Sequence, residues 1–213
     1  MGGVLRLIFY GVVVRVVVTF VLGLNVRHRE RLPRSGPAIL TANHNSHLDA
    51  MVLTTLLPLR LLPRVRPVAA ADYFLRNAPL AWFAREVVGI LPITRKRADG
   101  GEDPLAGCDE ALGRGDILIF FPEGSRGEPE KLGDFKRGIG LLAERHPDVP
   151  IYPIFTHGLG KALPRNEGLL VPFLLDVFVG EPLRGRDGSE SLVARLRECI
   201  ISLGHEERFA EWD

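Results

Sequence analysis

Apolar and polar positions alternate in blocks along the chain, and the blocks predict alternating strands and helices. Runs typical of buried strands occupy residues 38–42 (AILTA), 67–71, 90–94, 117–121 (ILIFF) and 149–155 (VPIYPIF). Helical patterns occupy residues 51–57, 80–88, 104–113, 139–144 and 190–203. The prolines in 149–155 favour an edge strand or a bulge. This alternation predicts a single α/β domain with a mixed, largely parallel sheet flanked by helices.

The longest apolar run covers residues 4–24 (VLRLIFYGVVVRVVVTFVLGL). As a continuous helix it would be roughly 31 Å long, close to the thickness of the hydrocarbon core. Two arginines interrupt it, Arg6 and Arg15, and an unpaired cation deep in lipid costs about 2.5 to 3.5 kcal/mol. Nine residues apart, they project to opposite sides of an ideal helix. We expect residues 1–25 to form a shallow or re-entrant membrane anchor whose arginines reach the headgroups.

Two other readings of this segment stay open at this point. It could be a buried helix, or a pair of Val-rich strands around Gly11 and Gly23, within a soluble core. A secretory signal fits poorly, because the segment lacks a basic start and a small-residue cleavage site. Residues 26–213 are expected to form the folded domain that follows this segment.

The composition and charge of the chain limit the classes of partner that it is expected to bind. The chain has 213 residues, enough for one domain, and 27 basic against 26 acidic side chains give a net charge of +1. A chain with so small a net charge has no overall positive potential that would favour nucleic acid as a partner. The basic stretch 27–34 (RHRERLPR) could meet anionic lipid headgroups or form a solvated loop. Cys108 and Cys199 fit neither a disulfide framework nor a metal site, which suits a reducing cytosol.

The polar segment NHNSHLD, residues 43–49, lies where the strand at 38–42 should turn into a helix. A sharp turn would let Asp49 accept a hydrogen bond from one nitrogen of His44, leaving the other nitrogen as a base. Ser46 and Thr41 lack the Gly-x-Ser-x-Gly context of a nucleophile. The pattern therefore favours activation of a substrate hydroxyl without an acyl-enzyme.

The same segment fits two other interpretations. A His and an Asp in a loop often only cap a helix. His44, His47 and Asp49 could instead form a metal trio, but no second cluster supplies a further ligand at a recognisable spacing. We expect no metal site.

A second polar loop follows the apolar run at 117–121. Glu123 and Arg126 lie in a loop that contains Gly124 and Gly127, where a guanidinium and backbone N–H groups could face a phosphate, although an ordinary turn with a surface ion pair has the same residues. Arg95, Lys136 and Arg137 are further cations at the ends of expected elements.

Four segments, taken in order, resemble the blocks of the glycerolipid acyltransferase family, the 1-acyl-glycerol-3-phosphate acyltransferases and their relatives. Residues 43–49 are similar to NHxSxxD, residues 89–95 (GILPITR) to the second block, residues 121–127 (FPEGSRG) to FPEGTR, and residues 149–154 (VPIYPI) to the last, proline-containing block. Together they extend over roughly residues 31–160.

The resemblance implies that residues 26–213 form a catalytic domain with the glycerolipid acyltransferase fold, and it implies a role for each matching residue. His44 would deprotonate the acceptor hydroxyl, Asp49 would orient His44, and the hydroxyl would attack the thioester of acyl-CoA or acyl-carrier protein, with no metal or other cofactor. The acceptor would be bound by residues of the second and third blocks and of the FKxG-like stretch at 136–138, namely Arg95, Glu123, Gly124, Ser125, Arg126 and Lys136.

The implied reaction acylates a lysophospholipid, first of all 1-acyl-glycerol-3-phosphate to give phosphatidic acid. If the amino-terminal segment spans the membrane, the arginines that follow it predict that the catalytic domain lies on the cytoplasmic face of the cell membrane. Three departures stand out. Ser125 replaces a threonine, Pro92 interrupts the second block, and Ala69-Ala70-Ala71 stands where relatives often carry a basic pair. The last departure leaves another lyso-lipid, such as a lyso-ornithine lipid, as an alternative acceptor. A non-catalytic lipid carrier or scaffold on the same fold is the alternative from a different class.

Overall fold

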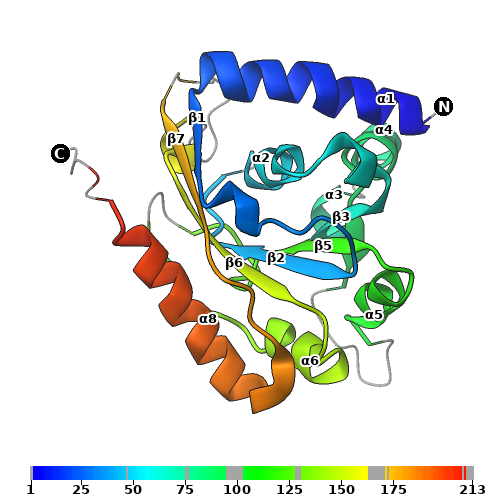
Figure 1. Cartoon of the computed structure of the whole chain (residues 1–213). Coiled ribbons are helices and arrows are strands. Elements are labelled where there is room, and N and C mark those ends of the chain that lie inside the picture. Colours follow the sequence, from blue (N-terminus) through cyan, green and yellow to red (C-terminus); the bar gives the residue numbers. More distant parts are fainter. Residues whose placement is uncertain are drawn as a thin grey trace.

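The fold was obtained as a computed structural model that describes residues 2–46, 48–74, 77–94, 103–127, 131–162, 171, 173–207 and 209. Within these residues the centre is a sheet with the order β1-β7-β6-β2-β5-β3-β4 (Figure 1). The strands are β1 Leu24–Arg27, β2 Ala38–Ala42, β3 Val65–Ala70, β4 Leu91–Ile93, β5 Ile117–Phe120, β6 Ile151–His157 and β7 Leu175–Val179. Neighbouring strands are parallel except β6 and β7. The expected mixed, largely parallel sheet is confirmed.

Helices cover both faces of this sheet (Figure 1). They are α1 Gly2–Ile8, η1 Phe9–Val14, η2 Val17–Val21, η3 Arg29–Arg31, α2 Asp49–Leu56, η4 Leu59–Arg64, α3 Ala71–Phe74, α4 Ala78–Trp82, η5 Phe83–Val88, α5 Ala106–Gly113, α6 Gly138–Arg145, α7 Leu159–Ala162, η6 Gly185–Asp187 and α8 Ser189–Gly204. The amino-terminal helix and α2 lie on one face, and α5, α6 and α8 lie on the other. The helices expected at 51–57, 80–88, 104–113, 139–144 and 190–203 all form.

The central strands are buried because both of their faces are covered. Along β2, Leu40 packs into the core beneath α2, whereas the next residue back, Ile39, packs against α5, α6 and α8. This alternation follows from the period of a strand. All four residues of β5 are buried, as its unbroken apolar run predicts for a parallel strand covered on both sides.

Of the two positions expected for the prolines of residues 149–155, an edge strand or a bulge, the edge strand was wrong. β6 lies between β2 and β7. The carbonyl of Pro153 accepts a hydrogen bond from the Gly180 N–H. In a strand, the N–H and C=O of one residue point to the same side, so the missing N–H of Pro153 faces the same place, just beyond Val179, where β7 ends. The proline therefore lies where the regular ladder between β6 and β7 ends.

Two strands, β1 and β7, were not predicted. Each is short, and they pair with each other across roughly 150 residues of chain, from Leu24↔Leu175 to Arg27↔Phe178. The basic stretch 27–34 is ordered against them. Arg31 donates a hydrogen bond to the Val179 carbonyl and forms an ion pair with Glu181. Pairing partners so distant in sequence left no local signal.

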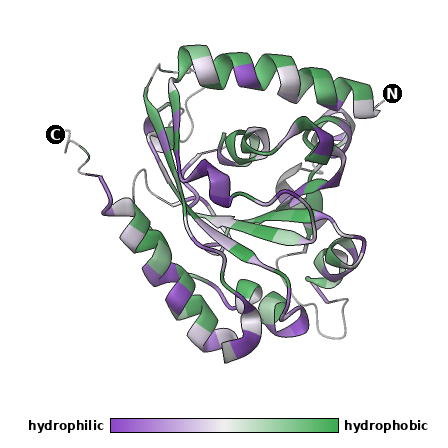
Figure 2. Cartoon of the chain, viewed as in Figure 1, coloured by the Kyte–Doolittle hydropathy of each residue, from purple (hydrophilic) through white to green (hydrophobic). Residues whose placement is uncertain are grey.

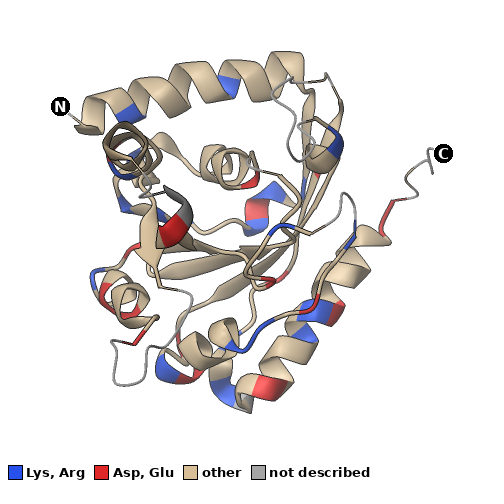
Figure 3. Ribbon diagram, turned by 180° about the vertical axis from the view of Figure 1, so that it is seen from behind, with Lys and Arg blue, Asp and Glu red and all other residues tan. Residues whose placement is uncertain are grey.

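The amino-terminal segment is a helix from Gly2 to Val21, long and apolar enough to cross a membrane by length and composition. It lies across the domain above α2 (Figure 1) and is apolar along most of its length (Figure 2). The only charged bands on it are its two arginines (Figure 3). The strand-pair reading is therefore wrong.

The expectation that both arginines reach the lipid headgroups was also wrong. Arg6 is only 7% exposed and donates a hydrogen bond to the Val65 carbonyl, and Arg15 donates to the carbonyls of Thr55 and Leu57. The reason is the winding of the helix. Two π-helical stretches, η1 and η2, place more residues in each turn than an α-helix does, so the two side chains do not point in opposite directions.

Candidate active site

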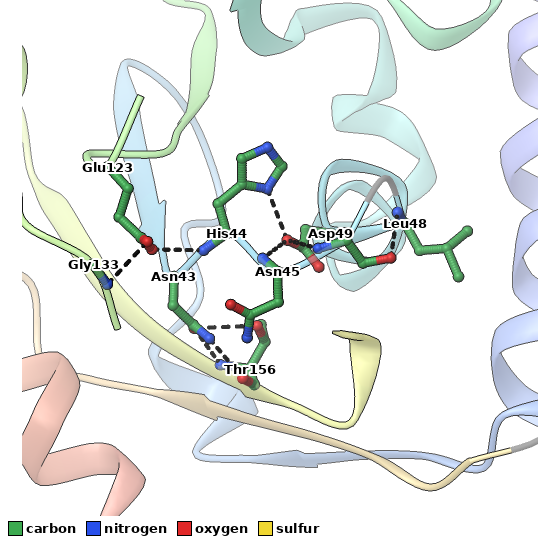
Figure 4. A network of polar contacts seen from close by, with 9 residues as sticks. Asn43, His44, Asn45, Leu48, Asp49, Glu123, Gly133 and Thr156 are labelled. Carbon is green, nitrogen blue, oxygen red and sulfur yellow. Dashed lines mark hydrogen bonds and ion pairs between the residues drawn. The ribbon is translucent and has the colours of Figure 1, made fainter. Parts of the chain in front are cut away.

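The segment that links β2 to α2 is anchored at its first residue. The side chain of Asn43 donates a hydrogen bond to the Thr156 carbonyl at 2.8 Å and accepts one from the Thr156 N–H at 2.8 Å (Figure 4). Both residues are buried. Because Thr156 lies in the neighbouring strand β6, these two hydrogen bonds fix where the chain leaves the sheet. The site thus forms at the carboxyl end of parallel strands, where α/β sheets bind ligands.

The turn after Asn43 brings His44 and Asp49 together. Nδ1 of His44 lies 2.8 Å from Oδ2 of Asp49. The same oxygen accepts hydrogen bonds from the backbone N–H groups of Asn45 at 2.7 Å and Ser46 at 2.9 Å (Figure 4). The Asp49 side chain is fully buried, whereas that of His44 is 20% exposed. An ionised carboxylate can only accept, so Nδ1 carries the proton and the outer nitrogen, Nε2, has a free lone pair.

The plane of the His44 ring is fixed by an aromatic neighbour. Phe121, the residue directly after β5, stacks on the imidazole with the ring centroids 4.0 Å apart and an interplanar angle of 16°. The ring therefore has an apolar wall on one side and a carboxylate behind it. A histidine held in this way by an aspartate can act as a general base towards the hydroxyl of a bound substrate.

Glu123 holds the backbone of His44. Its Oε1 accepts a hydrogen bond from the His44 N–H at 2.8 Å, and its Oε2 accepts one from the Gly133 N–H at 3.0 Å (Figure 4). The residue is 4% exposed. The Gly127 N–H donates to the His44 carbonyl at 2.9 Å, so the loop after β5 binds both polar groups of the His44 backbone.

The electrostatic setting of Glu123 follows from this position. Burial raises the pKa of the Glu123 carboxyl above its ordinary value, and the N–H groups of His44 and Gly133 act in the opposite direction. Both oxygens are directed at backbone donors.

A groove of about 600 Å³ opens in front of His44. Near the histidine it is lined by Gly124, Ser125, Arg126 and Lys136. Most of the remaining wall is apolar and comes from β3, β4 and the residue before it, the segment just before α5, and α6, with Val68, Ile90, Ile93, Leu105 and Leu141 among its residues. The groove therefore joins a cationic end beside the base to an apolar trough, which is suited to an amphiphile.

Gly124 determines how closely Lys136 approaches this loop. Its φ of +70° is a left-handed conformation, and a Cβ at this position would lie 3.1 Å from the Lys136 Nζ. Glycine meets both requirements, because it adopts positive φ without strain and leaves the space empty.

The structure divides the residues proposed from the sequence into three sets. Those that line the groove are His44, Gly124, Ser125, Arg126 and Lys136. Asp49 and Glu123 lie behind the lining, with their oxygens bound to the His44 ring and to backbone N–H groups. Arg95 and His47 lie outside the described residues. Among the residues that are described, no three His, Cys, Asp or Glu side chains are grouped to hold a metal ion.

Sequence reasoning missed three contributors to the geometry, which are Thr156, Phe121 as the stacking partner, and Gly133. Gly133 had a signal only in retrospect, because a Cβ there would lie 2.6 Å from the Glu123 Oε2. None of the three is near His44 in sequence. Their roles arise because β2, β5 and β6 lie side by side and bring the segments at their carboxyl ends together.

The fold and the site define an α/β protein with a histidine–aspartate base beside an amphiphile-sized groove. Comparison with known proteins gives the family. The family model described as Acyltransferase matches residues 23–157, more than half of the chain. The chain belongs to this acyltransferase family.

The chain is also similar in sequence to named proteins. The chain is 32% identical over 164 residues to the chloroplastic 1-acyl-sn-glycerol-3-phosphate acyltransferase LPAT1 of Arabidopsis thaliana, covering 76% of this chain and 44% of the relative. It is 32% identical over 132 residues to the human 1-acyl-sn-glycerol-3-phosphate acyltransferase alpha, covering 62% and 44%. The chain thus spans less than half of the length of these two relatives.

A solved structure shares the fold. The 1-acyl-sn-glycerophosphate acyltransferase PlsC from Thermotoga maritima superposes with a TM-score of 0.77 at 20% identity, over 96% of this chain and 81% of that one. The fold expected from the four sequence blocks is confirmed.

Proposed function

We propose that this protein transfers a fatty acyl group from a thioester, acyl-CoA or acyl-carrier protein, to the free hydroxyl of a lysophospholipid. The acceptor we propose is 1-acyl-glycerol-3-phosphate, and the product is then phosphatidic acid. The observation that carries the proposal is the His44–Asp49 pair at the mouth of the groove, with Nδ1 bound to the carboxylate and the other ring nitrogen available to a substrate.

In this mechanism His44 takes the proton from the acceptor hydroxyl through Nε2, and the hydroxyl oxygen attacks the thioester carbonyl carbon. Asp49 holds the ring and stabilises the imidazolium that forms. The tetrahedral intermediate collapses, the carbon–sulfur bond breaks, and the thiolate takes the proton back from His44. An ester and a free thiol result, so neither an acyl-enzyme nor a metal ion is required.

The cationic end of the groove supports a phosphate-bearing acceptor. Arg126 and Lys136 both line the groove on the side of His44, and guanidinium and ammonium groups bind phosphate oxygens strongly. We propose that both contact the phosphate, together with the Ser125 hydroxyl. The family resemblance adds Arg95 to this set. The names of the relatives, 1-acyl-sn-glycerol-3-phosphate acyltransferases, support the same acceptor.

Another lyso-lipid stays a second candidate on one observation. Ala69 and Ala70 line the groove where relatives often carry a basic pair, so the wall at this point offers no cation to a phosphate. An acceptor with a less acidic headgroup, such as a lyso-ornithine lipid, needs fewer cations.

We further propose that the protein works at the cytoplasmic face of the cell membrane. The outward side of the amino-terminal helix exposes Val4, Ile8, Val12, Val16 and Phe20, an apolar surface that water does not favour. A site held at the interface receives its lipid without exposing each CH₂, which costs about 0.8 kcal/mol. Soluble thioester donors reach it from the cytoplasm.

The test is an assay of the purified protein in lipid vesicles. Palmitoyl- and oleoyl-CoA, and acyl-carrier protein loaded with the same chains, are offered against a panel of lyso-lipids, and products are identified by mass spectrometry. We expect phosphatidic acid from wild type, and a rate lower by about 10² to 10⁴ from His44→Ala. Activity that survives exhaustive chelation would exclude metal-dependent hydrolysis. If wild type forms no product with any donor, the proposal fails and the carrier reading replaces it.

A further inference from the structure

The amino-terminal helix presents one straight buried stripe to the domain. Its members recur at every fourth position and are all at most 7% exposed, namely Arg6, Tyr10, Val14, Val18 and Leu22. In a regular α-helix, residues four apart drift by about 40° at each step, so five of them would be spread over about 160° of the helix circumference. The wider π turns of η1 and η2 compensate for this drift. The winding of the helix thus keeps one face on the domain.

Polar contacts hold both halves of this helix in place. Near its start, Arg6 donates to the Val65 carbonyl at 2.6 Å, and the Tyr10 hydroxyl donates to the Val88 carbonyl at 3.2 Å. Further along, Arg15 donates through one Nη2 to the carbonyls of Thr55 at 3.4 Å and Leu57 at 3.3 Å. These last two carbonyls belong to the end of α2.

The contact made by Arg15 is a helix cap supplied by a different helix. The last carbonyls of any α-helix have no partner within it, and a cation at that end also interacts favourably with the helix dipole. Helix α2 spans only Asp49–Leu56, so the end that Arg15 binds is two turns from the end that carries Asp49. A helix this short shifts as one body.

The other end of α2 is the catalytic end. Asp49 is its first residue, and its Oδ2 receives the three hydrogen bonds from His44 Nδ1 and from the N–H groups of Asn45 and Ser46. Between the two ends, Val52, Leu53 and Leu56 pack in the same core as Tyr10 and Val14 of the amino-terminal helix. A displacement of α2 along its axis would therefore lengthen the bonds to Asp49.

We infer that Arg15 is a positioning residue for the His44–Asp49 pair, acting through α2. The membrane-facing helix then does more than anchor the protein, because its docked position sets the geometry of the base. This inference rests on the proposed function only for its effect on turnover. The structural coupling can be measured without any reaction.

The test compares Arg15→Gln with Arg15→Lys, and uses Arg85→Gln as the matched control. Arg85 is an exposed arginine of η5, on a neighbouring helix. Hydrogen–deuterium exchange of the full-length protein in vesicles is followed at the amides of Asn45 and Ser46, which report on Asp49, and along α2. We expect exchange at these amides to be at least fivefold faster in Arg15→Gln, near wild type in Arg15→Lys, and unchanged in Arg85→Gln.

The kinetic part of the test separates positioning from membrane binding. In Arg15→Gln we expect kcat to fall about tenfold, with KM for the lysolipid and partition into vesicles within twofold of wild type, and Arg15→Lys to recover most of kcat. Weaker vesicle binding with unchanged kcat would overturn the inference and would assign Arg15 to a headgroup contact. Unchanged amide exchange in Arg15→Gln would also overturn the inference. Faster exchange with unchanged kcat would show that Arg15 caps α2 but does not position the His44–Asp49 pair, and this outcome would overturn the inference as well. If wild type is inactive, the proposed function fails, and the exchange measurement still decides the coupling.

Discussion

At the scale of single residues, the base is supported mainly through backbone contacts. Glu123 belongs to the block that the family resemblance linked to acceptor binding, yet both of its oxygens are bound to N–H groups of His44 and Gly133. It is 4% exposed and does not line the groove. We interpret Glu123 as the residue that fixes the His44 backbone against the segment at 131–137.

Replacing Glu123 by glutamine should therefore impair catalysis more than acceptor binding. The amide would keep one acceptor and direct an NH₂ group at an N–H donor, so we expect the free energy of unfolding to fall by about 1.5 to 3 kcal/mol. In steady-state kinetics kcat should fall about tenfold or more with KM for the acceptor nearly unchanged.

Gly133→Ala provides a matched variant, since its Cβ would lie 2.6 Å from Oε2 of an intact Glu123, while Gly113→Ala, with no atom within 4 Å of its Cβ, is the control. We expect the first to reproduce the loss of kcat and the second to behave as wild type. A raised KM with unchanged kcat in Glu123→Gln would instead assign Glu123 to the acceptor.

The sequence located part of this site. His44 and Asp49 were predicted because they lie within one turn of chain, and the short chain between them permits few arrangements. Glu123 and Arg126 were singled out from the same loop, but the loop alone could not show that the carboxylate points inward while Arg126 lines the groove. That difference depends on Gly133 and His44, which approach from separate segments.

At the scale of elements, the amino-terminal helix has two apolar faces with different partners. One packs into the core with α2, and the other exposes Val4, Ile8, Val12, Val16 and Phe20. Neighbouring Phe83 extends the exposed apolar surface and contacts Phe9 of the helix, with their rings edge to face at 5.5 Å. A helix docked in this way is expected to lie along one leaflet.

Membrane association is best tested on the outer face only. Deleting residues 1–24 would remove Tyr10, Val14, Val18 and Leu22 from the core, so loss of binding could not be told from unfolding. Phe20 is 81% exposed, and Phe20→Ser should weaken partition into vesicles by about tenfold with the thermal midpoint unchanged. Phe20→Leu, which stays apolar, should partition nearly as wild type in a flotation assay. Equal partition of Phe20→Ser and wild type would contradict a lipid-facing helix.

At the scale of the whole molecule, the groove exists because of the order of the strands and the helices above them. Its walls come from β3 and β4, the segment just before α5, and α6, which are spread over much of the chain. The cationic end comes from the loops after β5. We expect the apolar part to receive an acyl chain, and its length to limit the chains that the protein accepts.

Leu141 of α6 offers a way to shorten the groove without disturbing the core, since it lines the groove and is 41% exposed. Leu141→Trp should shift the preference towards acyl chains shorter by about two to four carbons, because the indole would occupy volume in the trough. Leu141→Met, nearly equal in volume, is the control and should leave the profile unchanged. Competition among acyl-CoAs of different length measures both, and an unaltered preference in Leu141→Trp would place the acyl chain elsewhere.

Local pattern alone determined the α/β alternation, the identity of the central strands, the apolar character of the amino-terminal segment and the His44–Asp49 pair. These features depend on residues close together in sequence, where strand period, helix period and chain reach leave little choice. Only the tertiary structure decided that β6 is interior, that β1 and β7 pair, that Arg6 and Arg15 turn inward, and that Glu123 binds the His44 backbone. Each of these depends on a partner tens of residues away or more, and long-range packing has no local periodicity from which it could be read.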